Sequence, residues 1–83
     1  MDKIYVFNGQ DITLLVCMQL RDVAECVAKR LDLPFDKAIY KVFASQTWED
    51  VTHVENALWA ESAEYIADRF FEEYERMQLS EQA

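Results

Sequence analysis

Hydrophobic residues recur every three or four positions between residues 11 and 31, the spacing that places them on one face of an α-helix. Asp11 precedes the series as the expected N-cap, and Lys29 and Arg30 suit the negative pole at its end. Pro34 stops the helix, because proline cannot continue one. The pattern predicts an amphipathic helix over 11–31, with inward positions Ile12, Leu15, Val16, Leu20, Val23, Val27 and Leu31.

The same spacing predicts helices near 35–45 and 63–78. Pro34 is well placed before the first of them, and Ser62 is the expected N-cap of the second. The expected inward side chains are Phe35, Ala38, Ile39, Val42 and Phe43 in the first, and Tyr65, Ile66, Phe70, Tyr74 and Met77 in the second.

The segment 47–60 has a less regular pattern between these helices. Ser45 and Thr47 are both possible caps at its start, and Thr52 followed by Glu55 matches a capping box. We therefore expect one broken helix or two short ones here. Rings from this segment should pack with the start of the last helix, in a cluster of Trp48, Trp59, Tyr65 and Ile66.

Residues 1–9 form an N-terminal arm of a different kind. Its run Ile4 to Phe7 favours a β-strand, and Asn8-Gly9 is a strong hairpin signal only where a second strand follows. The next segment has the pattern of a helix and so offers no second strand. Three structures of the arm therefore stay open: a lone strand, an extended arm or a helical turn. We expect the arm to pair between two copies of the chain, giving a homodimer. The competing outcome is that Tyr5 and Phe7 fold back on their own helices.

These elements predict an all-α fold class, a small bundle of three to four helices in one domain, 1–83, with a frayed tail at 79–83. Apolar residues make up 52% of the chain, which excludes a disordered protein. The longest apolar run is too short to cross a bilayer, and no basic amphipathic face is available for a membrane surface. Two cysteines without a signal peptide indicate a reducing, cytoplasmic location.

Charge and side-chain chemistry argue against catalysis and against nucleic acid. Sixteen acidic and eight basic side chains give a net charge of −8, which repels phosphate backbones. A lone histidine, His53, has no neighbouring nitrogen or thiol that would complete a metal site, and Glu72, Glu73 and Glu75 read as a solvated helix face. We therefore expect no enzyme activity, no metal and no cofactor.

Two features exceed what a minimal core needs: many aromatic rings in the second half, and seven acidic against two basic side chains in residues 61–83. Aromatic rings beside an acidic helix are suited to a protein interface. The simpler interpretation, that most of these rings fill the core, stays open. The candidate partner-binding residues are Trp48, Trp59, Tyr65, Phe71, Glu64, Asp68 and Glu72.

About half of the chain, from Leu31 to Tyr74, resembles a family of short all-helical bacterial domains of unknown function. The resemblance rests on four strings: Leu33-Pro34-Phe35-Asp36-Lys37-Ala38, Phe43-Ala44-Ser45-Gln46-Thr47-Trp48, Leu58-Trp59-Ala60-Glu61-Ser62 and Tyr65-Ile66-Ala67-Asp68. The family shows a Leu-Trp-x-x-Ser-x-x-Tyr-Ile motif at its last helix. Its members are thought to be encoded beside ADP-ribosyltransferase-like proteins.

The resemblance implies the small partner of a toxin–antitoxin or similar pair, and it carries over no catalytic residues. Together with the acidic charge, it favours a small non-catalytic interaction protein, an antitoxin-like partner or inhibitor of a neighbouring enzyme. The alternative is an acidic mimic of nucleic acid, an inhibitor of the phage type. That alternative requires carboxylates on one face at spacings near those of phosphates.

Overall fold

The computed structural model describes residues 4–82, and the side chains of residues 4–80. It confirms the all-helical fold class. A short hairpin of β1 (Val6–Phe7) and β2 (Gln10–Asp11) precedes the helices α1 (Thr13–Leu31), α2 (Phe35–Phe43), α3 (Gln46–Thr52) and α4 (Ala63–Gln82). Two 3₁₀ turns, η1 (Val54–Asn56) and η2 (Leu58–Ala60), join α3 to α4.

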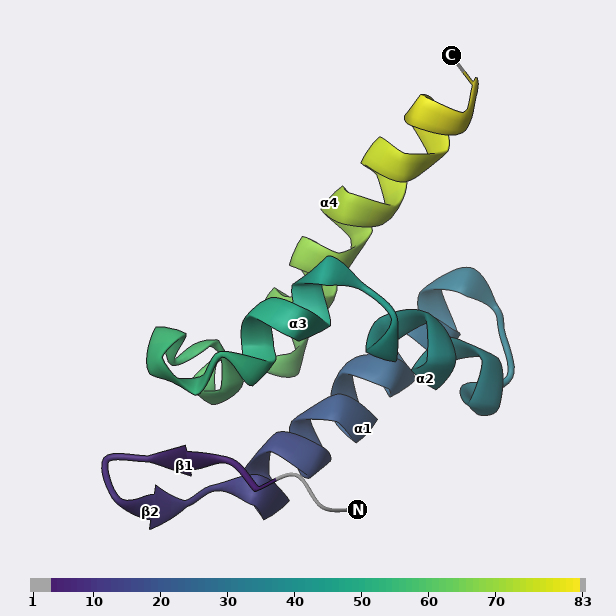
Figure 1. Cartoon of the computed structure of the whole chain (residues 1–83). Helices are drawn as coiled ribbons and strands as arrows, with labels where there is room; N and C mark the ends of the chain where they lie inside the picture. The colour runs from purple at the N-terminus through teal and green to yellow at the C-terminus, as the bar shows by residue number, and fades with distance from the viewer. Residues whose placement is uncertain (1–3, 83) are drawn as a thin grey trace.

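The helix α1 is the centre of the molecule, because both α2 and α4 pack against it. Figure 1 shows the hairpin beside the start of α1, α2 near its other end, and α3 lying against α4. The C-terminal part of α4 extends away from the other helices, and the molecule measures 45 × 25 × 23 Å.

The core is assembled from small groups of apolar residues on each helix. Val16, Val23 and Val27 of α1 are almost completely buried, as the helical spacing predicts. The other helices contribute Ala38, Val42, Trp48, Val51, Ile66, Ala67 and Phe70.

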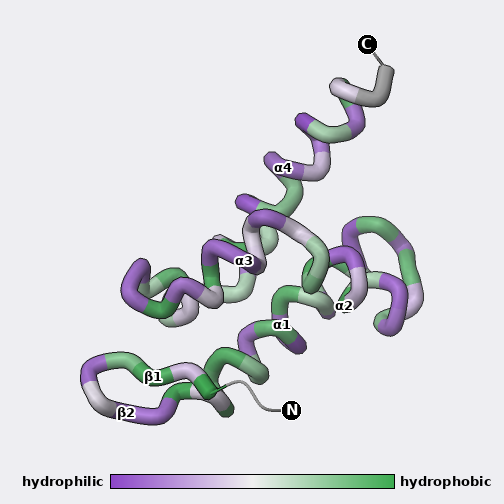
Figure 2. The backbone as a smooth tube through the Cα atoms, viewed as in Figure 1, coloured by the Kyte–Doolittle hydropathy of each residue, from purple (hydrophilic) through white to green (hydrophobic). Residues whose placement is uncertain are grey.

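Five residues that the spacing places inside are instead well exposed: Leu15, Phe35, Phe43, Tyr65 and Met77. Phe35 and Phe43 are the first and last residues of the short helix α2, and Met77 belongs to the C-terminal part of α4, which extends away from the other helices (Figure 1). Figure 2 shows an excess of hydrophobic residues in the first part of α1.

The expectation that Asn8-Gly9 lacks a second strand is wrong. Gln10–Asp11 pairs antiparallel with Val6–Phe7, and Asn8 and Gly9 form the turn with φ of 51° and 79°. Positive φ at both central residues is the requirement of a two-residue hairpin turn. A polar strand of two residues has no alternating pattern, so only the Asn8-Gly9 turn indicated the hairpin in the sequence.

The arm folds back on its own helices. Tyr5 and Phe7 pack against the core, and the Phe7 ring meets the edge of Trp59 with centroids 5.4 Å apart. The Ile12 N–H donates to the Tyr5 carbonyl at 2.8 Å. We expected a homodimer because the strand of the arm had no partner within the chain. The strand has one, so that reason no longer applies. Residues 1–3 of the arm lie outside the described residues.

Ser45, one of the two possible caps at its helix, and Ser62 cap their helices as expected, but Asp11 is not the N-cap of α1, because Ile12 occupies that position without a side-chain cap hydrogen bond. The Asp11 carboxylate accepts the Thr13 N–H at 2.9 Å, the Ser45 hydroxyl accepts the Trp48 N–H at 3.0 Å, and the Ser62 hydroxyl accepts the Tyr65 N–H at 3.1 Å. Thr52 does not open a helix. It ends α3, and its hydroxyl donates to the Glu49 carbonyl.

The expectation of a broken segment at 47–60 is confirmed, since α3, η1 and η2 occupy it. The helix α4 continues to Gln82, four residues beyond its expected end at 78, and the fraying of the tail from residue 79 stays a prediction. Glu, Arg, Met, Gln and Leu dominate its last turns, and all are good helix formers. Residue 83 lies outside the described residues.

Candidate protein-binding surfaces

Glu73 links α4 to the start of α3. Its carboxylate accepts the N–H groups of Gln46 and Thr47 at 3.0 and 2.9 Å, and the Thr47 hydroxyl at 2.8 Å. Partial burial raises the pKa of Glu73, but these hydrogen bonds and Arg76 outweigh it and hold the pKa below its ordinary value. The interpretation of Glu73 as part of a solvated face is therefore wrong. It satisfies N–H groups that the first turn of α3 leaves open.

Two of the predicted partner-binding rings belong to the body of the molecule. Trp48 is only 5% exposed and lies in the core, so most of its ring is covered by the protein itself. Trp59 is half-buried, and its indole N–H donates to the Val54 carbonyl at 2.9 Å. Ile66 is buried as expected, whereas Tyr65 is 44% exposed.

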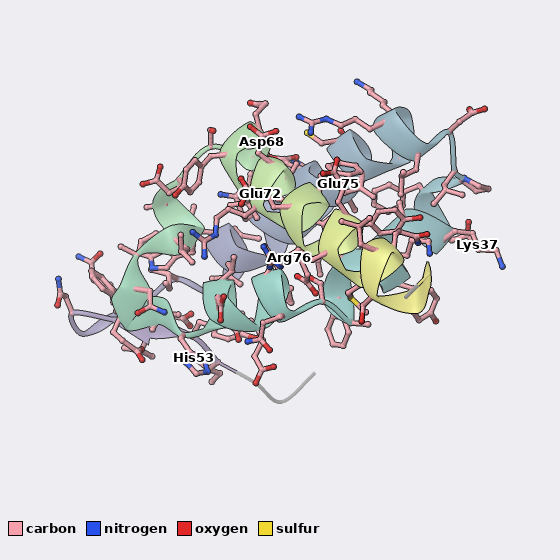
Figure 3. The ribbon with its side chains drawn as sticks, turned by 90° about the horizontal axis from the view of Figure 1, so that it is seen from above. Lys37, His53, Asp68, Glu72, Glu75 and Arg76 are labelled. Carbon is pink, nitrogen blue, oxygen red and sulfur yellow. The ribbon has the colours of Figure 1, made fainter. Side chains whose placement is uncertain are left out.

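The other predicted residues lie on the outer side of α4. Glu64, Asp68 and Glu72 are exposed and follow one another at intervals of four residues. Figure 3 shows Asp68, Glu72 and Glu75 spaced along this helix, with His53 apart from them in that view. Asp68 pairs with Arg30 of α1 at 2.9 Å, and the Arg30 guanidinium covers the Phe71 ring at 4.9 Å. Phe71 is thus partly covered from within the chain.

A mostly apolar hollow of about 440 Å³ lies between α1 and the junction of α2 with α3. We call it the aromatic groove. Phe43, at its edge, is 66% exposed. The principal lining residues are Tyr5, Val16, Cys17, Leu20, Phe43 and Trp48.

The polar groups of the aromatic groove are largely engaged within the protein. The Ser45 hydroxyl donates to the Val42 carbonyl at 2.6 Å and also accepts a helix N–H. The Thr52 hydroxyl donates to the Glu49 carbonyl at 2.7 Å. The Glu49 carboxylate also lines the groove, but most of the lining side chains are apolar, so the groove is suited to an apolar side chain.

The groove was not predicted from the sequence, because helical spacing places Phe43 in the core. The available signal was the adjacency of Val42 and Phe43, which point about 100° apart on a helix. The short helix α2, packed mainly against α1, buries Val42 but leaves Phe43 exposed.

Within residues 4–82, no three His, Cys, Asp or Glu side chains gather closely enough to hold a metal ion. No helix in the described part of the chain is both long and apolar enough to cross a membrane. No protein-family model, curated protein or solved structure matches this chain.

Proposed function

We propose that this chain is a small acidic interaction protein that binds a protein partner through the aromatic groove. The supporting observation is the exposed Phe43 ring at the edge of a preformed apolar hollow of about 440 Å³. Aromatic side chains beside a hollow are typical anchors of protein interfaces, because they bury a large area with little loss of side-chain freedom. A large apolar side chain of the partner would fill the groove.

The partner that we propose is an ADP-ribosyltransferase-like protein encoded nearby, for which this chain would be an antitoxin-like partner or inhibitor. The sequence strings in 31–74 support this choice. The net charge of −8 also supports it, because an acidic protein is steered toward a basic cleft such as a nucleotide-binding site. Cys17 and Cys26 are free thiols, in keeping with a reducing cytoplasm.

The alternative, a nucleic-acid mimic, has less support. Glu64, Asp68, Glu72 and Glu75 span about 16 Å of α4, so neighbouring carboxylates are about 5.5 Å apart along the axis. Duplex DNA carries one charge per about 1.7 Å. One of the four carboxylates, Asp68, is also paired with Arg30.

The test is co-expression with the neighbouring transferase-like protein, followed by measurement of the complex in solution. Phe43→Gln should weaken the complex about tenfold, because it removes the ring at the groove edge. Tyr40→Gln is the matched control: Tyr40 lies on the same helix, is 76% exposed and does not line the groove. A complex that responds equally to both variants, or no complex with wild type, contradicts the proposal.

A further inference from the structure

A second apolar surface lies on the other side of α1, facing η2. Leu15 and Met18, one turn apart on α1, are 51% and 41% exposed. With Trp59 and Ala60 of η2 they line a shallow hollow of about 230 Å³. Leu15 was expected to face the core, so this apolar surface is one that the fold leaves uncovered.

The surface is held in shape by Gln19, which lies between its two halves. The Gln19 side-chain amide donates to the carbonyls of both Trp59 and Glu61, so it ties η2 to α1. The Trp59 ring is fixed as well, by its hydrogen bond to Val54 and its contact with Phe7. A preformed surface loses little freedom when a partner binds it.

Carboxylates border this surface. Asp22 and Glu61 line the hollow, and Glu64 follows Glu61 in the chain, in the first turn of α4. Partial burial and then Glu64 raise the pKa of the Cys26 thiol, with Asp22 adding to the effect and Arg30 and Lys29 opposing it.

The negative charge of this border is only partly neutralised. In the part of the chain that the structure describes, no basic side chain lies within ion-pair distance of Glu61 or Glu64. Asp22 pairs only with its neighbour Arg21, at 3.1 Å, and both side chains are about half exposed.

We propose that this acid-rimmed patch, made of Leu15, Met18, Trp59, Asp22, Glu61 and Glu64, docks a lysine- or arginine-rich segment of a protein. The methylene stems of such side chains would lie on Leu15 and Met18, while their cationic ends reach the carboxylates. A second copy of this chain is the wrong occupant, because each copy carries a net charge of −8.

The patch deepens the proposed function and rests on it for the partner being a protein. It is separate from the aromatic groove, which uses Val16, Cys17 and Leu20 on another side of α1. A partner that engaged both surfaces would hold α1 from two sides. The groove would supply an apolar anchor, and the patch would select for basic charge.

The probe is an amphipathic peptide of leucine and lysine, with a leucine–glutamate peptide as its acidic control, titrated into the isotopically labelled full chain. Amide shifts in the NMR spectrum should concentrate at the first half of α1, η2 and the first turns of α4. The variant with Asp22→Asn, Glu61→Gln and Glu64→Gln should bind the basic peptide about tenfold more weakly.

The matched control variant carries Asp36→Asn, Glu55→Gln and Glu75→Gln. It removes the same charge from exposed positions that do not line the patch, and it should bind like wild type. Equal losses of peptide affinity in the two variants would show that only net charge matters and would overturn the inference. Amide shifts centred away from the patch would overturn it as well. Circular dichroism shows whether each variant keeps its helices.

The two proposals fail separately. If wild type forms no complex with the transferase-like protein but the basic peptide still binds the patch, the proposed function fails and the patch stands. If the transferase-like protein binds wild type, binds Phe43→Gln more weakly and binds both charge variants equally, the groove proposal stands and the patch proposal fails.

Discussion

At the scale of single residues, Glu73 shows how one carboxylate joins two helices. Glu73 lies on α4 and accepts three hydrogen bonds from the start of α3. It is 26 residues away in sequence from Thr47, which donates two of them. Ser45 satisfies one further N–H of the same turn. The two residues divide the capping of α3 between them, so neither alone is sufficient.

Glu73→Gln should lower the free energy of unfolding by about 1–2 kcal/mol at neutral pH, because an amide oxygen is a weaker acceptor for two helix N–H groups. Urea unfolding measures the change. Glu72→Gln, on the exposed neighbouring position, is the control and should change the free energy by less than about 0.5 kcal/mol.

The Glu73 contribution should also depend on pH. Because its folded-state pKa is depressed, the contribution is fully present above the ordinary value of 4.5 and is lost as the pH falls through the folded-state pKa. The difference in stability between wild type and Glu73→Gln should therefore shrink in acid below that value. A difference that grows in acid would contradict this account.

At the scale of elements, the hairpin is a short piece of β-structure held by the helices. Two strands of two residues are not stable alone in water. Their support is tertiary: the Phe7 ring against Trp59, and the Tyr5 N–H donated to the Thr13 hydroxyl at 2.8 Å. The turn Asn8-Gly9 is the one local feature that specifies the hairpin.

Gly9→Ala should destabilise the protein by about 1 kcal/mol, because Gly9 has φ of 79°. No atom lies within 4 Å of the position that a Cβ would take, so the cost is backbone strain alone. Asn8→Gly, at φ of 51°, relieves strain at the adjacent position and should cost less than about 0.5 kcal/mol. Equal thermal shifts in the two variants would show that the turn is not formed as described.

At the scale of the whole molecule, charge and the paired hairpin both oppose self-association. The arm no longer needs a strand from a second copy, and two copies at −8 each repel. Full-length protein should therefore be a monomer at micromolar concentration by light scattering. Deleting residues 1–8 should lower stability, because it removes Tyr5 and Phe7, and should leave the mass in solution monomeric. A full-length dimer that becomes a folded monomer on deletion would contradict this prediction.

The sequence by itself determined the helices, because their signals are local. Apolar spacing of three and four, Pro34, and the caps Ser45 and Ser62 act within one or two turns. The broken segment at 47–60 and the outward acidic stripe of α4 could be predicted for the same reason. The start of α1 is the exception, because its N-cap is Ile12 and not Asp11.

Tertiary structure alone decided which margins of those helices are covered. Phe43 and Leu15 fit a buried stripe by spacing, yet they are exposed, because burial depends on how much of α1 and α2 the short α3 and the turns η1 and η2 can reach. The pairing of Gln10–Asp11 and the capping role of Glu73 depend likewise on contacts between separate segments. Both candidate surfaces arise from such uncovered margins, so they could be found only once the packing was known.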